Sequence, residues 1–473
     1  MNEHCGYVVR INHLRPHSNA DRLQIANIFN NPVIVSLNVK IGDIGVYFPS
    51  GLQLSERFCA ANDLVRRKDE NGKQIGGYLD SDKRNIKAIK LRGEMSDGLY
   101  LPITCLADFC KISDLKAGDT IDVVNGELIC QKYVPRRNPR PTRDATSGKP
   151  KKPKANIAPT FYEHVDTAQL AYNLHVFKPG DIVQLTLKMH GTSGRTARVP
   201  IRHTKRTWFD KLFHRHGKDY MEYGYITGTR RVVLDGKRKG GFYESDDFRK
   251  AMAAKFENKL RKGETVYYEI VGFQGPEGAP IMGQVANSKV KDEEFTKQYG
   301  DTTTFSYGCN QWAGYTKNEY REDDTCGRGY RAGVCCDIYV YRMTMVNEDG
   351  DVVEYSPAQI KERCEQMNVN VVPEFETFII PQYEFVENEN GACVQPMNAG
   401  EYVLRKVEQY FDGPDPIGKT HVREGVVARI LNRPNFAVYK HKNFSFKVLS
   451  NIIVDQLTDE QIDGMSQDML EEM

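Results

Sequence analysis

The string LKMHGTSGR, residues 187–195, places a lysine directly before a turn rich in glycine and hydroxyl residues. Lys188 ends a strand of alternating polarity, and His190, Gly191 and Thr192 follow it almost at once. A lysine beside such a turn of backbone N–H groups can meet a phosphate as a counter-charge or as an amine nucleophile. The string is not a Walker A loop, because here the lysine precedes the glycines. These residues predict a phosphate site and leave both roles of Lys188 open.

Further strings follow in chain order: GTRRVVL (228–234), VYYEIVGF (266–273), DIYVYRMT (337–344), REGVVARI (423–430) and YKHKNFSFK (439–447). With LKMHGTSGR they resemble the motifs of the covalent nucleotidyltransferases, the superfamily of ATP-dependent RNA ligases, DNA ligases and mRNA capping enzymes. The histidine in K-x-H-G resembles the RNA-ligase branch. Each string is common alone, but six in order over 255 residues, from Lys188 to Lys442, form a strong signal.

The resemblance implies that Lys188 is the catalytic residue that becomes attached to AMP, and that Glu424 binds a metal ion. It also places Arg231 on the opposite face of its strand from Arg230. Many relatives have Glu directly before the lysine, where this chain has Leu187. The residues assigned to ATP or AMP are His190, Gly191, Thr192, Arg195, Arg230, Glu269, Tyr341, Lys440 and Lys442.

The residue types fit this chemistry on physical grounds as well. A free lysine has a pKa near 10.4, so attack near pH 7.5 requires a deprotonation that costs roughly 4 kcal/mol. Neighbouring cations, meaning Lys440, Lys442 and bound Mg²⁺ (or Mn²⁺), favour the neutral amine and neutralise the triphosphate of ATP. Glu424 among these cations suits a metal, Glu269 can accept from ribose hydroxyls, and Tyr341 offers a flat face to a purine. A lysine-paired carboxylate and a core aromatic are the alternative interpretations of Glu424 and Tyr341.

The first 128 or so residues contain short β-rich runs between turns, which predicts a small barrel. RPHSNADRLQIANI (15–28) and IKAIKLRGEMSDGLYLPI (86–103) resemble the N-terminal OB module of one group of phage and bacterial RNA ligases. The resemblance implies a nucleic-acid-binding module, with Lys87, Lys90 and Arg92 as candidate phosphate contacts. A solvated strand face is the other interpretation of these three residues.

The remainder of the chain mixes strands with helices, so the predicted fold class is α+β. Helical periodicity or helix-start signals predict helices over residues 246–260 and 356–367. The Gly-, Tyr- and Cys-rich insert at 275–333 matches no pattern. The expected units are an OB-like module (1–130), a basic Pro-rich linker (131–160), an adenylyltransferase domain of antiparallel sheets with flanking helices (161–452) and an acidic tail (453–473).

Composition indicates a globular protein with its charges in blocks. The 473 residues include 65 Lys+Arg, 63 Asp+Glu and 40% apolar residues. There is no run of the roughly 18 apolar residues that a membrane helix needs and no signal-peptide pattern. Eleven cysteines without regular spacing favour a reducing, cytoplasmic location. Nine Lys/Arg against one acid at 131–156, and twelve against four at 198–240, are typical of surfaces that bind a phosphate backbone.

These observations predict an ATP-dependent RNA ligase that forms lysyl-AMP, transfers AMP to a 5′-phosphate end and seals it to a 3′-hydroxyl. The expected substrate is a nicked RNA or RNA/DNA duplex, and no membrane partner is expected. A DNA ligase and a capping guanylyltransferase are the alternatives. Both usually place an OB domain after the last motif, where only 31 residues follow Lys442 in this chain. A nucleic-acid-binding protein without catalysis is a further alternative, and the sequence does not predict the oligomeric state.

Overall fold

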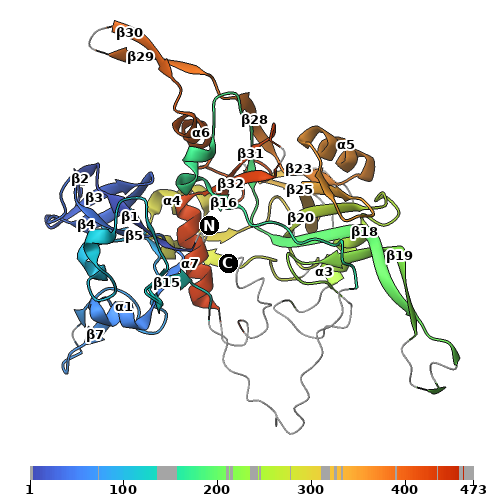
Figure 1. Ribbon diagram of the computed structural model, residues 1–473, viewed down its shortest axis with the longest axis horizontal. Coiled ribbons are helices and arrows are strands. Elements are labelled where there is room, and N and C mark those ends of the chain that lie inside the picture. The colour runs from blue at the N-terminus through green and yellow to red at the C-terminus, as the bar shows by residue number, and fades with distance from the viewer. Residues whose placement is uncertain are drawn as a thin grey trace.

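The computed structural model is dominated by β-sheet, with few helices, which confirms the α+β class (Figure 1). Most of the predicted linker and acidic tail, and part of the 275–333 insert, lie outside the residues that the structure describes. Those residues are 4–72, 74–135, 157–208, 212–213, 217–234, 243, 247–276, 278–309, 320–323, 328–331, 334–388, 391–433, 435–457 and 462.

The chain up to Lys132 forms small antiparallel sheets. Four strands pair in the order β11-β5-β1-β12, three in the order β2-β3-β4, and others pair two by two. Their apolar sides enclose one cluster around Phe48, Leu54 and Phe58 and a second around Val33 and Tyr47. The elements are β1 (Gly6–Arg10), β2 (Leu14–Pro16), β3 (Leu23–Ile28), β4 (Asn31–Ser36), β5 (Ile44–Phe48), β6 (Leu52–Leu54), α1 (Glu56–Ala61), β7 (Arg66–Lys68), β8 (Gln74–Gly76), β9 (Ala88–Leu91), β10 (Glu94–Asp97), β11 (Leu99–Pro102), β12 (Thr120–Ile121), β13 (Val123–Val124), β14 (Glu127–Leu128) and β15 (Cys130–Lys132).

A five-stranded sheet brings distant parts of the chain together. Its order is β16 (Ala168–Gln169), β32 (Ala437–Lys442), β31 (Gly425–Ile430), β17 (Ile182–Lys188) and β28 (Glu374–Ile379). Val183 and Leu185 of β17 pack in a core that includes Val403 of α6 (Ala399–Glu408), so burial specifies which side of β17 faces inward. Lys188 is the last residue of this strand.

A second sheet follows the order β19 (Lys218–Gly228), β18 (Thr192–Lys205), β20 (Glu264–Gly272), β25 (Cys336–Val346) and β26 (Val352–Glu354), with β27 (Asn370–Val371) parallel to β25. Its core includes side chains of α3 (Asp247–Ala254) and α5 (Pro357–Met367). The residues between β17 and β18, 189–191, carry the chain from the first sheet to the second. The LKMHGTSGR string therefore joins the two sheets.

Two helices test the sequence predictions. α5 begins after Ser356, whose side chain accepts from Gln359 N–H in a capping box, with a proline at the first turn. The predicted helix over 356–367 is therefore confirmed. α3 ends at Ala254, six residues before the predicted end at 260, because the chain tightens into i→i+3 turns and Asn258 takes a φ of 60°. Phe256 and Leu260 are buried nonetheless.

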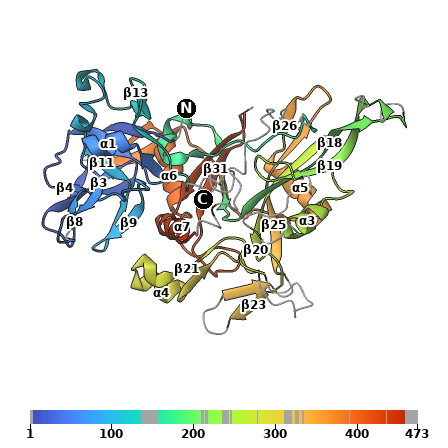
Figure 2. The ribbon, with the colours of Figure 1, turned by 90° about the horizontal axis from the view of Figure 1, so that it is seen from below.

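The N-terminal sheets contact the body of the molecule, meaning the described residues from 157 onward. Figures 1 and 2 show α7 (Phe444–Gln456) between the two parts. Its Asn451 donates to the carbonyl oxygen of Ala88 at 3.4 Å, and Lys447 pairs with Asp97. The remaining elements are η1 (Ile103–Leu106), η2 (Ile112–Asp114), η3 (Leu170–Tyr172), η4 (Leu174–Val176), β21 (Gln284–Ala286), η5 (Asn287–Val290), α4 (Glu293–Tyr299), β22 (Thr302–Thr304), β23 (Tyr320–Asp323), β24 (Arg328–Arg331), β29 (Tyr383–Asn388) and β30 (Gly391–Pro396).

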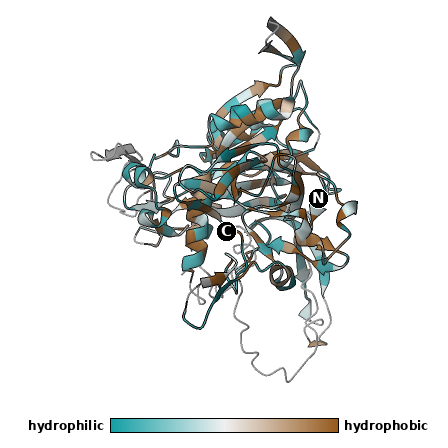
Figure 3. Cartoon of the chain, turned by 90° about the vertical axis from the view of Figure 1, so that its left-hand side faces the viewer, coloured by the Kyte–Doolittle hydropathy of each residue, from teal (hydrophilic) through white to brown (hydrophobic). Residues whose placement is uncertain are grey.

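Two hairpins project from the body. The hairpin of β29 and β30 extends at the top of Figures 1 and 3, and Figure 3 shows brown, apolar residues on it. Phe385 on this hairpin is 85% exposed. The hairpin of β18 and β19 projects from the side of the molecule that lies away from the N-terminal sheets. No helix within the described ranges is long and apolar enough to cross a membrane.

Candidate active site

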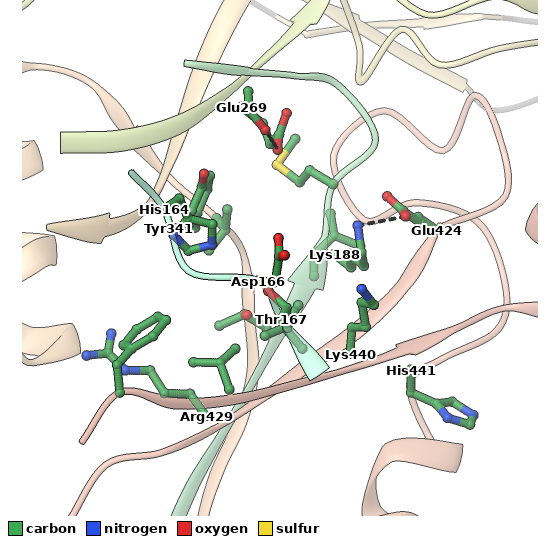
Figure 4. Close-up of a pocket in the computed structure, with 18 of the residues that line it drawn as sticks. His164, Asp166, Thr167, Lys188, Glu269, Tyr341, Glu424, Arg429, Lys440 and His441 are labelled. Carbon is green, nitrogen blue, oxygen red and sulfur yellow. Dashed lines mark hydrogen bonds and ion pairs between the residues drawn. The ribbon is translucent and has the colours of Figure 1, made fainter. Parts of the chain in front are cut away.

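Three neighbouring strands bring Lys188, Glu424 and Lys442 together. In the strand register, Lys188 lies opposite Gly425, and Gly425 lies opposite Lys442. Nζ of Lys188 is 2.7 Å from Oε1 of Glu424, and Nζ of Lys442 is 3.2 Å from the same oxygen. Figure 4 shows the contact between Lys188 and Glu424. Two of the predicted cationic residues thus share one carboxylate.

The two lysines determine the charge state of Glu424. This side chain is 2% exposed, and burial alone would raise the pKa of a carboxyl group. The positive charges of Lys188 and Lys442 outweigh burial and lower the pKa of Glu424 to about 2. Burial in turn lowers the pKa of Lys442, against the opposing effect of Glu424. Glu424 is therefore ionised at neutral pH, and its low pKa makes it a counter-charge and only a weak base.

Glycines let the backbone pass closely on both sides of this cluster. Gly425 has a φ of 151°, and a Cβ there would lie 2.0 Å from the carbonyl oxygen of His441. A Cβ at Gly191 would lie 2.5 Å from the carbonyl oxygen of Ile270. Any side chain at either position would push β31 from β32, or the 189–191 turn from β20.

The K-x-K pattern of β32 separates its side chains onto two faces. Lys440 and Lys442 lie on one face and His441 lies on the other, as the alternation of a strand requires. Figure 4 shows Lys440 pointing toward Lys188 and His441 pointing away. Lys188, Lys440 and Lys442 thus concentrate positive charge at one end of the cavity described below.

His190 is held as a neutral, buried ring. Its centroid lies 4.7 Å from the rings of Phe305 and of Phe446, both in edge-on geometry. Its backbone N–H donates to Tyr307 Oη at 2.6 Å. Burial lowers the pKa of His190 to about 3, although Glu424 partly opposes this effect. The 3.9 Å approach of His190 Nδ1 to Glu424 is therefore not an ion pair at neutral pH.

Tyr341 lies at the other end of the cavity, beside a residue that sequence reasoning missed. The ring of His164 is 5.0 Å from that of Tyr341, at 69° (Figure 4). Nη1 of Arg342 lies 3.3 Å from Nδ1 of His164. Burial, with the charge of Arg342, lowers the pKa of His164 well below its usual value. A guanidinium only donates, so Nδ1 accepts and the proton of the neutral ring is on Nε2.

Glu269 faces the cavity from β20. It lies opposite Ser193 in the register of β18 and β20, and Ser193 Oγ donates to its Oε1 at 3.0 Å. Figure 4 shows Glu269 above the other labelled side chains, between the Tyr341 end and the Lys188 end.

Arg230 and Arg231 both line the cavity, so Arg231 does not lie on the opposite face from Arg230. β19 ends at Gly228, and the chain then turns, with Val232 N–H donating to Thr229 Oγ1 at 3.1 Å. Both arginines therefore reach Asp166: Arg230 pairs with Oδ1, and Nη2 of Arg231 lies 3.6 Å from Oδ2. The prediction that strand alternation separates the two arginines was wrong.

Two residues assigned to ATP lie outside the cavity. Thr192 is 3% exposed, and Nη2 of Arg249 donates to its Oγ1 at 2.5 Å. Arg195 is 2% exposed: its Nε donates to the carbonyl oxygen of Thr229 at 2.9 Å and its Nη1 to that of Phe161 at 3.1 Å. The guanidinium also lies 4.2 Å from the centroid of the Phe161 ring. Arg195 thus holds segments beside the cavity and does not line it.

The candidate phosphate contacts of the N-terminal sheets face acids or solvent. Nζ of Lys87 lies 2.5 Å from Asp455, and Nζ of Lys90 lies 2.6 Å from Asp292. Both acids belong to the body, 368 and 202 residues away along the chain. Arg92 is exposed in the turn between β9 and β10, with a φ of 49°.

One cavity of about 1960 Å³ connects most of the candidate active-site residues. Its lining includes His164 and Tyr341, Lys188, and Ser50 and Lys132 of the N-terminal region. Of the predicted catalytic, nucleotide and metal residues, it is lined by Lys188, His190, Gly191, Arg230, Glu269, Tyr341, Glu424, Lys440 and Lys442.

Comparisons with known proteins agree with this architecture. No protein-family model matches the chain, and no curated protein sequence is significantly similar to it. A solved Naegleria gruberi RNA ligase mutant with AMP and Mn aligns with 96% of this chain and 99% of its own, at 14% identity and a TM-score of 0.50. A mutant of Naegleria gruberi RNA ligase R4a without ligand aligns with 97% of this chain and 100% of its own, at 15% identity and a TM-score of 0.50. The Naegleria gruberi RNA ligase with pyrophosphate aligns with 93% of this chain and 97% of its own, at 14% identity and a TM-score of 0.50. The chain has the fold of these RNA ligases, as the motifs predicted.

Proposed function

We propose that the protein is an ATP-dependent RNA ligase in which Lys188 forms a covalent lysyl-AMP. The observation that carries the proposal is the position of Nζ of Lys188, which faces a cavity beside Glu424 and Lys442. Three lysines, Lys188, Lys440 and Lys442, line the cavity beside one buried carboxylate, Glu424, so a bound anion would compensate the remaining positive charge. The triphosphate of ATP is such an anion.

The ends of the cavity suit the two ends of ATP. Tyr341 and His164 supply ring faces and one N–H donor for the purine. Glu269 suits the ribose hydroxyls, because a carboxylate accepts hydrogen bonds. Lys440, Lys442 and Lys188 suit the phosphates.

The first step forms a P–N bond and breaks a P–O bond. Nζ of Lys188 loses a proton and attacks the α-phosphorus, and pyrophosphate leaves with the electrons of the broken bond. Lys440 and Lys442 stabilise the negative charge that develops on the phosphate oxygens. Since the pKa of Glu424 is about 2, its carboxylate is a weak proton acceptor, and the proton passes to water through the exposed part of Lys188, which is 24% exposed.

The residues fit a divalent metal that is bound jointly with ATP. The described part of the chain has no group of three or more His, Cys, Asp or Glu residues that could hold a metal alone. Mg²⁺ is commonly bound by one or two carboxylates together with substrate phosphates. Within the same part of the chain, Oε2 of Glu424 has no hydrogen-bond partner and is the candidate ligand. When bound, Mg²⁺ or Mn²⁺ neutralises phosphate charge.

The later steps rest on the resemblance to RNA ligases. AMP passes from Lys188 to the 5′-phosphate of one strand, and the adjoining 3′-hydroxyl then displaces AMP to form the phosphodiester. A nicked RNA or RNA/DNA duplex is the proposed substrate. Residues 1–130 are the proposed OB-like module that holds this duplex, and 161–452 the proposed adenylyltransferase domain. The cavity suits such a substrate because it reaches Ser50 and Lys132 of the module.

Labelling with nucleotide triphosphates tests the first step. Incubation with α-labelled ATP and Mn²⁺ should label the wild-type protein, and peptide mapping should place AMP on Lys188. Lys188→Ala and Lys188→Arg should take no label, whereas Lys419→Ala, an exposed lysine outside the cavity, should label normally. Label from GTP alone would favour a capping enzyme, and no label would favour a binding protein without catalysis. A panel of nicked duplexes with RNA or DNA on each side then separates RNA from DNA ligase.

A further inference from the structure

The hairpin of β18 and β19 continues beyond the body as a two-stranded ribbon. β18 pairs with β19 as far as Lys205, but β20 pairs with β18 only between Thr192 and Ala197. Residues 202–208 and 218–222 are exposed as a result. In Figures 1 and 2 the ribbon lies at one end of the molecule and the N-terminal sheets lie at the other. Both could therefore contact one long ligand that crosses the body.

The tip of this ribbon brings like charges together. Lys205 lies directly opposite Lys218 in the register, and Arg206 adds a third exposed cation. Like charges directly opposite each other destabilise a strand pair. A two-stranded hairpin without packing is itself only marginally stable in water. An anionic ligand would offset the repulsion between the lysines.

Aromatic rings lie on the same face as the two lysines. His203 lies opposite Tyr220, and their rings stack with centroids 5.5 Å apart at 28°. Because side chains alternate, His203 and Lys205 share one face with Tyr220 and Lys218. Trp208, three residues after the end of β18, is 66% exposed. Cations beside exposed rings are typical of surfaces that bind single-stranded nucleic acid, and the cations by themselves suit the phosphates of a duplex.

We propose that the tip of the β18–β19 ribbon binds the phosphate backbone of the RNA duplex beside the ends that are joined. A-form RNA has a wide, shallow minor groove bordered by phosphates, and proteins recognise it mainly by shape. The ribbon then holds one arm of the duplex while the N-terminal sheets hold the other. This inference rests on the proposed function for the identity of the duplex.

The test removes the three cations at the tip. The triple variant Lys205→Gln, Arg206→Gln, Lys218→Gln is compared with Lys289→Gln, Lys291→Gln, Lys297→Gln, which removes three exposed cations around α4. Binding of a nicked RNA duplex is measured by fluorescence anisotropy over a series of salt concentrations. The tip variant should bind on the order of tenfold to a hundredfold more weakly, with a log–log salt slope about 3 units shallower. Glu222→Gln, on the same face of the ribbon, should strengthen binding.

The control variant should bind as the wild-type protein does, and all variants should form lysyl-AMP at the wild-type rate. Equal RNA affinity in the tip variant and the wild type would overturn the proposal, as would equal losses in both triple variants. A tip variant that changes only the oligomeric state in sedimentation would assign the ribbon to contacts between copies. Failure of the wild-type protein to form lysyl-AMP would instead overturn the proposed function and leave the binding comparison valid.

Discussion

Glu424 holds Lys188 and Lys442 through a single oxygen, Oε1, at 2.7 Å and 3.2 Å. The other oxygen, Oε2, makes no hydrogen bond to any residue that the structure describes. One carboxylate therefore stabilises two neighbouring cations, and its second, buried oxygen is the proposed metal ligand. This arrangement links the stability of the site to its proposed capacity for a metal ion.

Glu424→Gln should affect both properties. It leaves two ammonium groups without their counter-charge, so the free energy of unfolding should fall by about 1–3 kcal/mol. The larger costs known for fully buried pairs do not apply, because the lysines are 24% and 22% exposed. The Mn²⁺ concentration for half-maximal lysyl-AMP formation should rise by roughly tenfold or more. Urea unfolding and a Mn²⁺ titration measure the two effects.

Asp337→Asn is the matched control for Glu424→Gln. Asp337 is also buried and pairs with Lys255 at 2.9 Å. The Asp337→Asn variant should lose stability without a change in the Mn²⁺ requirement. An unchanged Mn²⁺ requirement in Glu424→Gln would contradict the assignment of Glu424 to the metal.

His190 should make stability fall in mild acid. The folded protein holds the pKa of His190 near 3 by burial, whereas an unfolded histidine has a pKa near 6.5. Between these values the unfolded state binds more protons, so its free energy falls relative to that of the folded state as pH decreases. Between pH 6.5 and 5 this contribution amounts to about 2 kcal/mol.

His190→Phe removes the titrating group and keeps a ring between Phe305 and Phe446. Urea unfolding at pH 7.5 and at pH 5 should therefore show a stability loss in the wild-type protein that is about 2 kcal/mol larger than in the variant. Equal losses would indicate that His190 is protonated in the folded protein.

The sequence predicted the α+β class, and most of its candidate site residues line one cavity because the sheets bring distant strands together. Lys188, Glu424 and Lys442 are such a set: their strands are neighbours in one sheet. Long-range packing was not predictable from short strings. Arg195 lies two residues after Ser193 in β18 and would face the same side by strand alternation, yet the ring of Phe161 covers its guanidinium. His164 lies outside every motif, and its contact with Tyr341 depends on long-range packing, so the sequence did not indicate it.

Arg195→Lys should destabilise the fold. A lysine cannot keep the planar contact with the Phe161 ring and the fixed bonds to two carbonyl oxygens, so the free energy of unfolding should fall by about 2–3 kcal/mol. The Kd for ATP should rise, because the segments that carry His164 and Arg230 lose their common support. Lysyl-AMP should still form at saturating ATP. Calorimetry and urea unfolding measure these values.

Arg198→Lys is the control on the same strand, since Arg198 donates to the carbonyl oxygen of Leu260 at 3.2 Å and is half-buried. It should cost less than about 1 kcal/mol. Complete loss of lysyl-AMP in Arg195→Lys at saturating ATP, with the fold intact, would instead indicate a direct contact between Arg195 and the nucleotide.

The pair of Lys90 and Asp292 distinguishes a contact between the N-terminal sheets and the body from a contact with RNA. The side chains are 23% and 26% exposed, so their ion pair should contribute only about 0.5–1 kcal/mol. A double-mutant cycle with Lys90→Gln and Asp292→Asn, followed by urea unfolding, measures this coupling. Asn is suitable at 292 because the side chain also accepts from Phe295 N–H and caps α4.

If the pair of Lys90 and Asp292 only joins the two parts, both single variants should bind nicked RNA like the wild type. A loss of RNA affinity in Lys90→Gln that persists in the double variant, and that Arg92→Gln shares, would make Lys90 a phosphate contact and contradict a purely structural pair.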